Sequence, residues 1–139
     1  MNVLKGKITG ILTEDEISLV HVDSNGWSLT SIVIDTPANS SYLQIDHSVN
    51  CIFKETEVMI AKTFPLAISV QNKIECRIKK ITTGKILCQV ELEIIPGSER
   101  PAMIRSIITR NACEQLRLQE NDLVMALIKT NEVSLSAHD

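Results

Sequence analysis

Aromatic side chains are scarce in this sequence of 139 residues, in which one Trp, one Tyr and two Phe make up 3%. A hydrophobic core must therefore be built from Ile, Val and Leu, and β-branched residues favour strands. Positive charge is not in excess either, because 14 Lys and Arg stand against 17 Asp and Glu. A nucleic-acid-binding surface needs a basic excess and stacking aromatics. These two shortages argue against a nucleic-acid partner.

Long apolar runs are also missing from the sequence. No apolar segment approaches the ~20 residues needed to cross a bilayer. The first ten residues, MNVLKGKITG, lack the apolar stretch of a signal peptide. We therefore expect a cytoplasmic protein with no membrane partner.

Spaced metal ligands are absent as well. Cys51, Cys76, Cys88 and Cys113 form no C-x-x-C pair, and the three histidines are scattered, so the spacing typical of zinc and redox sites is not found. We expect reduced, buried thiols that serve packing. No nucleophile, base and orienting group converge in the sequence, so neither a cofactor nor an enzymatic activity is predicted.

What the sequence does contain is an internal repeat. Residues 49–60 and 124–135 share the pattern V-x-small-apolar-apolar-K-x-x-E-V-x-apolar. A repeat of this kind decides how the whole fold is interpreted. It predicts a first domain at 1–62, a linker at 63–68 and a second domain at 69–139. Domains of roughly 65–70 residues are near the lower limit for an independent core, which favours association.

The order of predicted elements is the same in both halves. Three strands, a short helix and one or two closing strands are expected, with Asn25-Gly26 as a hairpin turn and Thr36-Pro37 as a helix start. The predicted strands cover 4–12, 17–22, 27–34 and 49–60, then 74–81, 86–94, 103–109 and 124–135; the helices run from 36 to 43 and from 111 to 118, and 96–101 is a hairpin loop. The predicted fold is mainly β, with two tandem OB-fold-like five-stranded barrels, each with one short helix. Closure into a barrel is inferred by analogy.

The second half also resembles a known family. Its segment S-V-Q-N-K-I-E-C-R-I at 69–78 is similar to the opening S-x-R-N-x-L-x-G-x-V of the molbindins, small molybdate-binding proteins also called Mop or TOBE domains. Residues 106–109 and 116–129 resemble that family's I-T…L-x-L-x-x-x-D-x-V-x-A-x-I-K ending. The first half resembles the family more weakly, so the chain looks like a two-domain molbindin.

This resemblance implies that molybdate or tungstate is bound between OB-type units, across the subunit interfaces of a homo-oligomer, with three two-domain chains favoured. A tetrahedral dianion presents only acceptor oxygens, so its site needs N–H groups, hydroxyls and a cation. By the motif match, the hydroxyl donors are Ser69 and Thr109, and the backbone N–H donors are those of Val70 and Asn72. Lys129 supplies the positive charge, and Thr130 supplies a hydroxyl or an N–H group. Gln71 replaces the family arginine, and Lys54 is the first-half counterpart of Lys129.

The first half departs from the family at several of these positions. Ile34 stands where Thr109 stands in the second half, Glu55 replaces Thr130, and Met1 replaces Gln71. A carboxylate beside the site repels a dianion. We therefore expect the first half to be mainly structural and the sites to be fewer or weaker than in a protein with two intact motifs.

Several alternatives remain open at this point. Taken singly, Lys129 is equally well a solvated lysine, Thr109 a helix cap and Asn72 a turn residue. Oxoanion storage, buffering or supply is the first functional hypothesis. The alternatives are a regulatory oxoanion-sensing module that acts in trans on a transporter or regulator, and a structural OB protein that has lost binding. The sequence does not distinguish molybdate from tungstate or another oxoanion.

Overall fold

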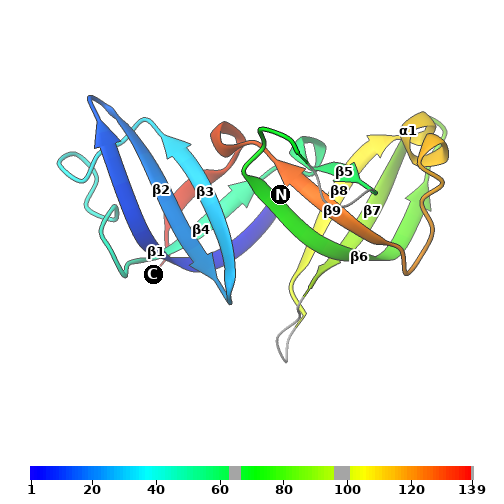
Figure 1. The fold of residues 1–139 in the computed structure, drawn as a ribbon, viewed down its shortest axis with the longest axis horizontal. Helices are drawn as coiled ribbons and strands as arrows, with labels where there is room; N and C mark the ends of the chain where they lie inside the picture. Colours follow the sequence, from blue (N-terminus) through cyan, green and yellow to red (C-terminus); the bar gives the residue numbers. More distant parts are fainter. Residues whose placement is uncertain (63–66, 96–100, 139) are drawn as a thin grey trace. The chain divides into compact units, whose positions relative to one another are not determined.

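The chain is mainly β-structure, as the sequence predicts. The computed structural model describes residues 1–62, 67–95 and 101–138, which form ten strands, one α-helix and two short 3₁₀-helices (Figure 1). By their contacts these elements divide into two compact units. Unit 1 comprises Met1–Phe53 and Lys129–Asp139, and unit 2 comprises Lys54–Ile128.

Unit 1 is a five-stranded antiparallel sheet. Its elements are β1 (Asn2–Glu14), β2 (Ile17–Ser24), β3 (Trp27–Val33), β4 (Ser48–Phe53), the 3₁₀-helix η2 (Thr130–Glu132) and β10 (Ser134–Ala137). The strand order is β10-β4-β1-β2-β3. Asn25 and Gly26 join β2 to β3 with φ angles of 52° and 91°, which confirms the predicted two-residue turn.

Unit 2 repeats this arrangement. It contains η1 (Glu55–Glu57), β5 (Met59–Ala61), β6 (Asn72–Thr83), β7 (Leu87–Ile94), β8 (Met103–Thr109), α1 (Arg110–Gln115) and β9 (Leu123–Ile128), in the strand order β5-β9-β6-β7-β8. The pairing register shifts between Ile8 and Gly10 in β1, and between Ile78 and Lys80 in β6. A bulge at matching places bends both sheets in the same way. In each unit the two edge strands approach without pairing along their described residues, which gives a partly open OB-like barrel.

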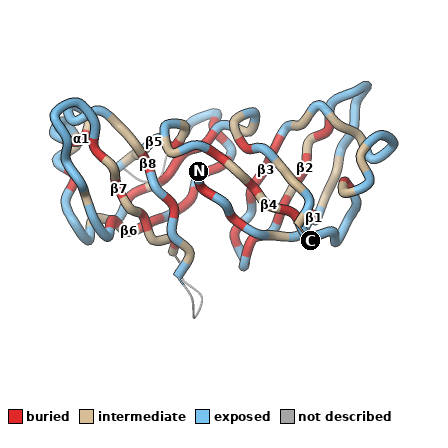
Figure 2. Tube along the Cα trace, turned by 180° about the vertical axis from the view of Figure 1, so that it is seen from behind, coloured by how far each residue is buried: buried red, intermediate tan, exposed pale blue. Residues whose placement is uncertain are grey.

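The interior of each unit is largely aliphatic. In β4 and β7 buried residues alternate with intermediate or exposed ones (Figure 2), the pattern of sheets with one face in a core. All four cysteines are buried with free thiols, as predicted. Burial raises the pKa of the Cys51 thiol and of the Cys76 thiol to about 12, so both stay protonated at neutral pH.

The last strand of each sheet comes from the other sequence repeat. In unit 1, β10 from the end of the second repeat pairs with β4, with Leu135 opposite Cys51. In unit 2, β5 from the end of the first repeat pairs with β9, with Ile60 opposite Ala126. The compact units therefore have different boundaries from the sequence repeats at 1–62 and 69–139, because the terminal strand of each repeat pairs in the sheet formed by the other repeat.

A buried serine fixes each exchanged segment. Ser31 in β3 donates a hydrogen bond to the carbonyl oxygen of Val133 at 2.5 Å, and Ser106 in β8 donates one to that of Val58 at 2.6 Å. Both serines are at most 1% exposed. The two bonds occupy corresponding positions in the two repeats, so the same contact secures both exchanged segments.

Replacing Ser106 with alanine is expected to lower the free energy of unfolding by about 1–3 kcal/mol, because the carbonyl of Val58 loses its buried donor. Urea denaturation of the purified chain measures this loss. Ser31→Ala should cost a similar amount, whereas Ser28→Ala, at an exposed position of β3, is the control and should change stability little. Equal stability of Ser106→Ala and Ser28→Ala would show that the serine bonds do not hold the exchanged segments.

The helix predicted at 36–43 does not form. Residues 35–44 make turns instead, in which the Thr36 N–H donates to the Asn39 side-chain oxygen at 2.9 Å. Asn and Ser side chains compete with the backbone for hydrogen bonds and favour turns over helices. Only the second half has its predicted helix, as α1. The hairpin loop predicted at 96–101 and most of the predicted linker lie outside the described residues.

Candidate functional site

The predicted donor segment leads into the first strand of unit 2. Asn72 is the first residue of β6 and pairs with Ile128, the last residue of β9. Val70 and Asn72 are buried, at 9% and 1% exposure, while Ser69 and Gln71 between them are exposed. The hydroxyl of Ser69 and the amide of Gln71 are therefore on the solvent side. Val70 and Asn72 place their side chains in the core, so an anion would meet their backbone.

Lys129 directly follows Ile128 in the chain. Its side chain is exposed, and its backbone is extended, with φ −65° and ψ 147°, as η2 begins. Lys54 precedes η1 with nearly the same angles, φ −76° and ψ 149°. The two lysines therefore occupy equivalent positions in the two repeats, and both are exposed where a strand ends.

The surroundings of the two lysines differ in charge. At η1 the Lys54 N–H donates to the carboxylate of Glu57 at 2.9 Å, and Glu55 adds a second acidic group in this turn. At η2 the residue after Lys129 is Thr130, which is half-buried, and Glu132 is the single acidic residue. A dianion is repelled by carboxylates. The charge pattern thus favours the Lys129 position over the Lys54 position.

Thr109 is both the last residue of β8 and the N-cap of α1. Its hydroxyl oxygen accepts a hydrogen bond from the Ala112 N–H at 3.0 Å. A hydroxyl that accepts in this way keeps its own proton for donation. Thr109 also borders a surface depression of about 570 Å³, together with Lys85, Ile86, Arg110, Asn111 and Glu114. Capping and anion binding are therefore compatible roles for this residue.

The structure does not bring Thr109 and Asn72 together within unit 2. Thr109 is opposite Leu87, the first residue of β7, which follows the end of β6. Asn72 stands at the beginning of the 12-residue strand β6. A strand rises about 3.3 Å per residue, so the two residues lie at opposite ends of this sheet. One anion cannot contact both residues of the same chain.

The predicted residues also divide between the compact units. Ser69, Val70, Gln71, Asn72, Thr109 and Lys54 belong to unit 2, whereas Lys129 and Thr130 belong to unit 1. The described residues contain no group of three or more His, Cys, Asp or Glu side chains able to hold a metal ion. No helix formed by them is long and apolar enough to span a membrane.

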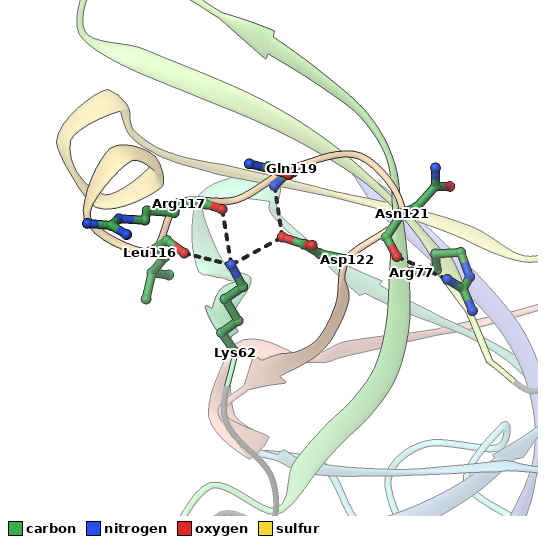
Figure 3. A network of polar contacts seen from close by, with 7 residues as sticks. All are labelled: Lys62, Arg77, Leu116, Arg117, Gln119, Asn121 and Asp122. Atoms are coloured by element: carbon green, nitrogen blue, oxygen red, sulfur yellow. Dashed lines mark hydrogen bonds and ion pairs between the residues drawn. The ribbon is translucent and has the colours of Figure 1, made fainter.

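Sequence reasoning missed one lysine that organises unit 2. Lys62, placed at the edge of the linker, follows β5 and directs its ammonium at three oxygens near the end of α1 (Figure 3). These are the carbonyl oxygens of Leu116 and Arg117, both at 3.0 Å, and the carboxylate of Asp122 at 3.3 Å. Such a partner for helix-terminal carbonyls becomes recognisable only when the fold is known.

Replacing Lys62 with alanine should lower the free energy of unfolding by about 1 kcal/mol, because two helix-end carbonyls and Asp122 lose a common cation. Thermal or urea denaturation measures the change. Lys79→Ala is the matched control, since Lys79 has a single ion pair, to Glu93 at 3.8 Å. If both variants were equally stable, Lys62 would be an ordinary surface lysine.

Comparison with known proteins agrees with this architecture. Residues 68–135, just under half of the chain, match the family model of the TOBE domain. The match ends within β10 and so includes the segment that this repeat gives to unit 1. No curated protein matches the sequence.

Among solved structures, the chain is similar to the cytoplasmic molybdate-binding protein ModG in a crystal form with molybdate bound. The two share 24% sequence identity with a TM-score of 0.90, and the similarity covers 99% of this chain and 96% of ModG. This likeness confirms the predicted fold of two OB-like units over the whole chain.

Proposed function

We propose that this protein binds a tetrahedral oxoanion, molybdate or tungstate, for storage, buffering or supply in the cytoplasm, and that it catalyses no reaction. The proposal rests on one observation above all. Asn72, the last residue of the donor segment 69–72, pairs with Ile128, the residue that precedes Lys129 in the chain, and this pairing supports the proposal. Neither 69–72 nor 129–131 contains an acidic residue. Hydroxyls, N–H groups and a cation without carboxylates are what a dianion requires.

The similar proteins support the same ligand. The solved structure of ModG is that of a molybdate-binding protein, with the anion bound. In the chain described here, the segment with the fullest set of donors is also the segment that matches the TOBE domain. We propose Ser69, Val70, Gln71, Asn72, Lys129 and Thr130 as binding residues, with Lys54 in a weaker position.

Thr109 enters this proposal through a second copy of the chain. Because Thr109 and Asn72 lie at opposite ends of the unit 2 sheet, a site that uses both must take Thr109 from another copy. We therefore propose a homo-oligomer, with three chains favoured, whose interfaces complete the oxoanion sites. Light scattering with and without molybdate measures the number of chains, and a monomer that still binds molybdate tightly would contradict this part.

A thermal-shift measurement with molybdate, tungstate and sulfate tests the function itself. A ligand present at about 100 times its dissociation constant adds about 2.7 kcal/mol to the stability of the folded state. We expect a clear rise in melting temperature with molybdate or tungstate. Absence of a shift with every oxoanion would overturn the proposal. Calorimetry then counts the sites, and because the first repeat carries Glu55 in place of Thr130, we expect fewer than two equal tight sites per chain.

A further inference from the structure

Two of the four buried cysteines lie together at the end of the unit 2 barrel where α1 rests. Cys88 lies on β7 next to Leu87, the residue that pairs with Thr109. Cys113 lies one turn into α1 and is its one buried residue. Both side chains border the same surface cavity of about 420 Å³. The helix therefore meets the sheet through a pair of thiols.

The two thiols border one cavity and influence each other, and both are largely shielded from solvent. Burial, a hydrogen bond with Cys88 and the charge of Glu114 raise the pKa of the Cys113 thiol. Cys113 is 7% exposed and Cys88 is 1% exposed, so reagents in the cavity reach Cys113 first. Cys51 and Cys76 are fully buried, and they lie on other strands, β4 and β6. They provide internal controls for any thiol reaction.

We propose that Cys88 and Cys113 are a dithiol that closes to a disulfide and thereby joins α1 covalently to β7. The required oxidant is a low-molecular-weight disulfide. The Cys113 thiolate attacks one of its sulfurs, and a mixed disulfide forms as one thiolate leaves. The Cys88 thiolate then attacks the Cys113 sulfur, and the second thiolate leaves. The two protons lost by the protein are taken up by the two leaving thiolates, so one disulfide is consumed and two small thiols are produced.

Other roles for this pair are less well supported. Structural zinc sites use four ligands, and no group of three or more candidate ligands exists among the described residues. A simple packing role predicts no reaction between the two sulfurs. The disulfide, by contrast, is supported by the cavity that both side chains border and through which a reagent reaches Cys113.

The position of the pair gives the disulfide a consequence for α1. Thr109 is the N-cap of α1, and Cys113 lies four residues further along the same short helix. A bond to Cys88 would fix this helix against the strand next to β8, which ends at Thr109. We expect the oxidised chain to have a higher melting temperature than the reduced chain, because the bond constrains the unfolded state.

Glutathione disulfide applied to the reduced, full-length protein at pH 8 tests the proposal. The thiols titrated under denaturing conditions should fall from four to two, and the intact mass should fall by about 2 Da, as expected for loss of two hydrogens. Proteolysis followed by mass spectrometry should identify a Cys88–Cys113 peptide pair. Reaction should accelerate as the pH rises, since the attacking species is the thiolate. Dithiothreitol should restore all four thiols.

Two variants make the outcome decisive. Cys88→Ser should stop at the mixed disulfide on Cys113, and Cys113→Ser should not react. The proposal is overturned if the wild-type chain also stops at the mixed disulfide, if the bond joins any other pair, or if all chains keep their thiols under these conditions. None of these readouts depends on oxoanion binding, so the result stands whether or not the proposed function is correct.

Discussion

Replacing Lys129 with alanine is expected to abolish the molybdate-induced rise in melting temperature while the ligand-free protein keeps its stability. The side chain is exposed, so its removal opens no cavity and leaves no buried group without a partner. What is lost is the cation that the proposed site offers to a dianion. An interaction with a charged group that is shielded from water is worth several times more than a surface ion pair. Loss of most of the ~2.7 kcal/mol of ligand stabilisation is therefore expected.

The controls for this experiment lie in the same chain. Lys80→Ala removes an exposed lysine from β6 and should leave the anion-induced shift intact. Lys54→Ala alters the equivalent position of the first repeat, where Glu55 and Glu57 follow, and should reduce the shift much less. An unchanged shift in Lys129→Ala, or an equal loss in all three variants, would place the anion elsewhere.

Replacing Gly6 with alanine is expected to lower the free energy of unfolding by about 2–3 kcal/mol, a large value for the addition of one methyl group. A Cβ atom at this position would lie 2.5 Å from the Asp23 carbonyl oxygen and 2.6 Å from the Val22 Cγ1 atom. The oxygen belongs to the backbone of the neighbouring strand, where Asp23 pairs with Lys7. The clash can be relieved only if β1 and β2 move apart.

Gly10→Ala is the matched control on the same strand. There the nearest atom to the new Cβ is His21 Cδ2 at 3.3 Å, which belongs to a half-exposed side chain that can rotate away. Urea denaturation of both variants should show a large loss for Gly6→Ala and a small one for Gly10→Ala. Similar losses for the two would mean that general strand propensity, not the close approach at Gly6, determines the effect.

The position in unit 2 that corresponds to Gly6 is occupied by Cys76. Gly6 lies opposite Val49 on β4, and Cys76 lies opposite Val124 on β9. Cys76 is nevertheless fully buried with a side chain, and its thiol donates to the carbonyl of Ile74 at 3.4 Å. In the segment that resembles the motif S-x-R-N-x-L-x-G-x-V, Cys76 stands at the glycine position, and unit 2 accommodates its side chain there.

The local structure was readable from the sequence because its causes are local. Alternation of Cys88, Val90 and Leu92 with polar residues specified a strand with one buried face, and β7 has that face. Asn25-Gly26 specified a turn that needs positive φ angles. The helix predicted at 36–43 was wrong because Thr36 and Pro37 are typical of a helix start, whereas Asn39 and the serines that follow are residue types whose side-chain hydrogen bonds favour turns.

The long-range arrangement was not readable in the same way. The apolar pattern of a strand shows that one of its faces is buried, but it does not show which strand is its neighbour in the sheet. The exchange of β5 and β10 between repeats therefore left no trace in the pattern of residues 49–60 and 124–135. The same limit applied to the site, because spacing along the chain cannot show that Thr109 and Asn72 lie at opposite ends of one sheet.

The exchanged strands make each repeat incomplete when it stands alone. A fragment that ends at residue 62 keeps β4 but has lost the β10 that pairs with it, and a fragment that starts at 69 keeps β9 but has lost β5. Each fragment would expose an open row of backbone donors and acceptors along that strand. Mixed in equal amounts, the two halves could restore each other's missing edge. A cut in the segment between β5 and β6 should therefore leave a two-piece protein that stays associated.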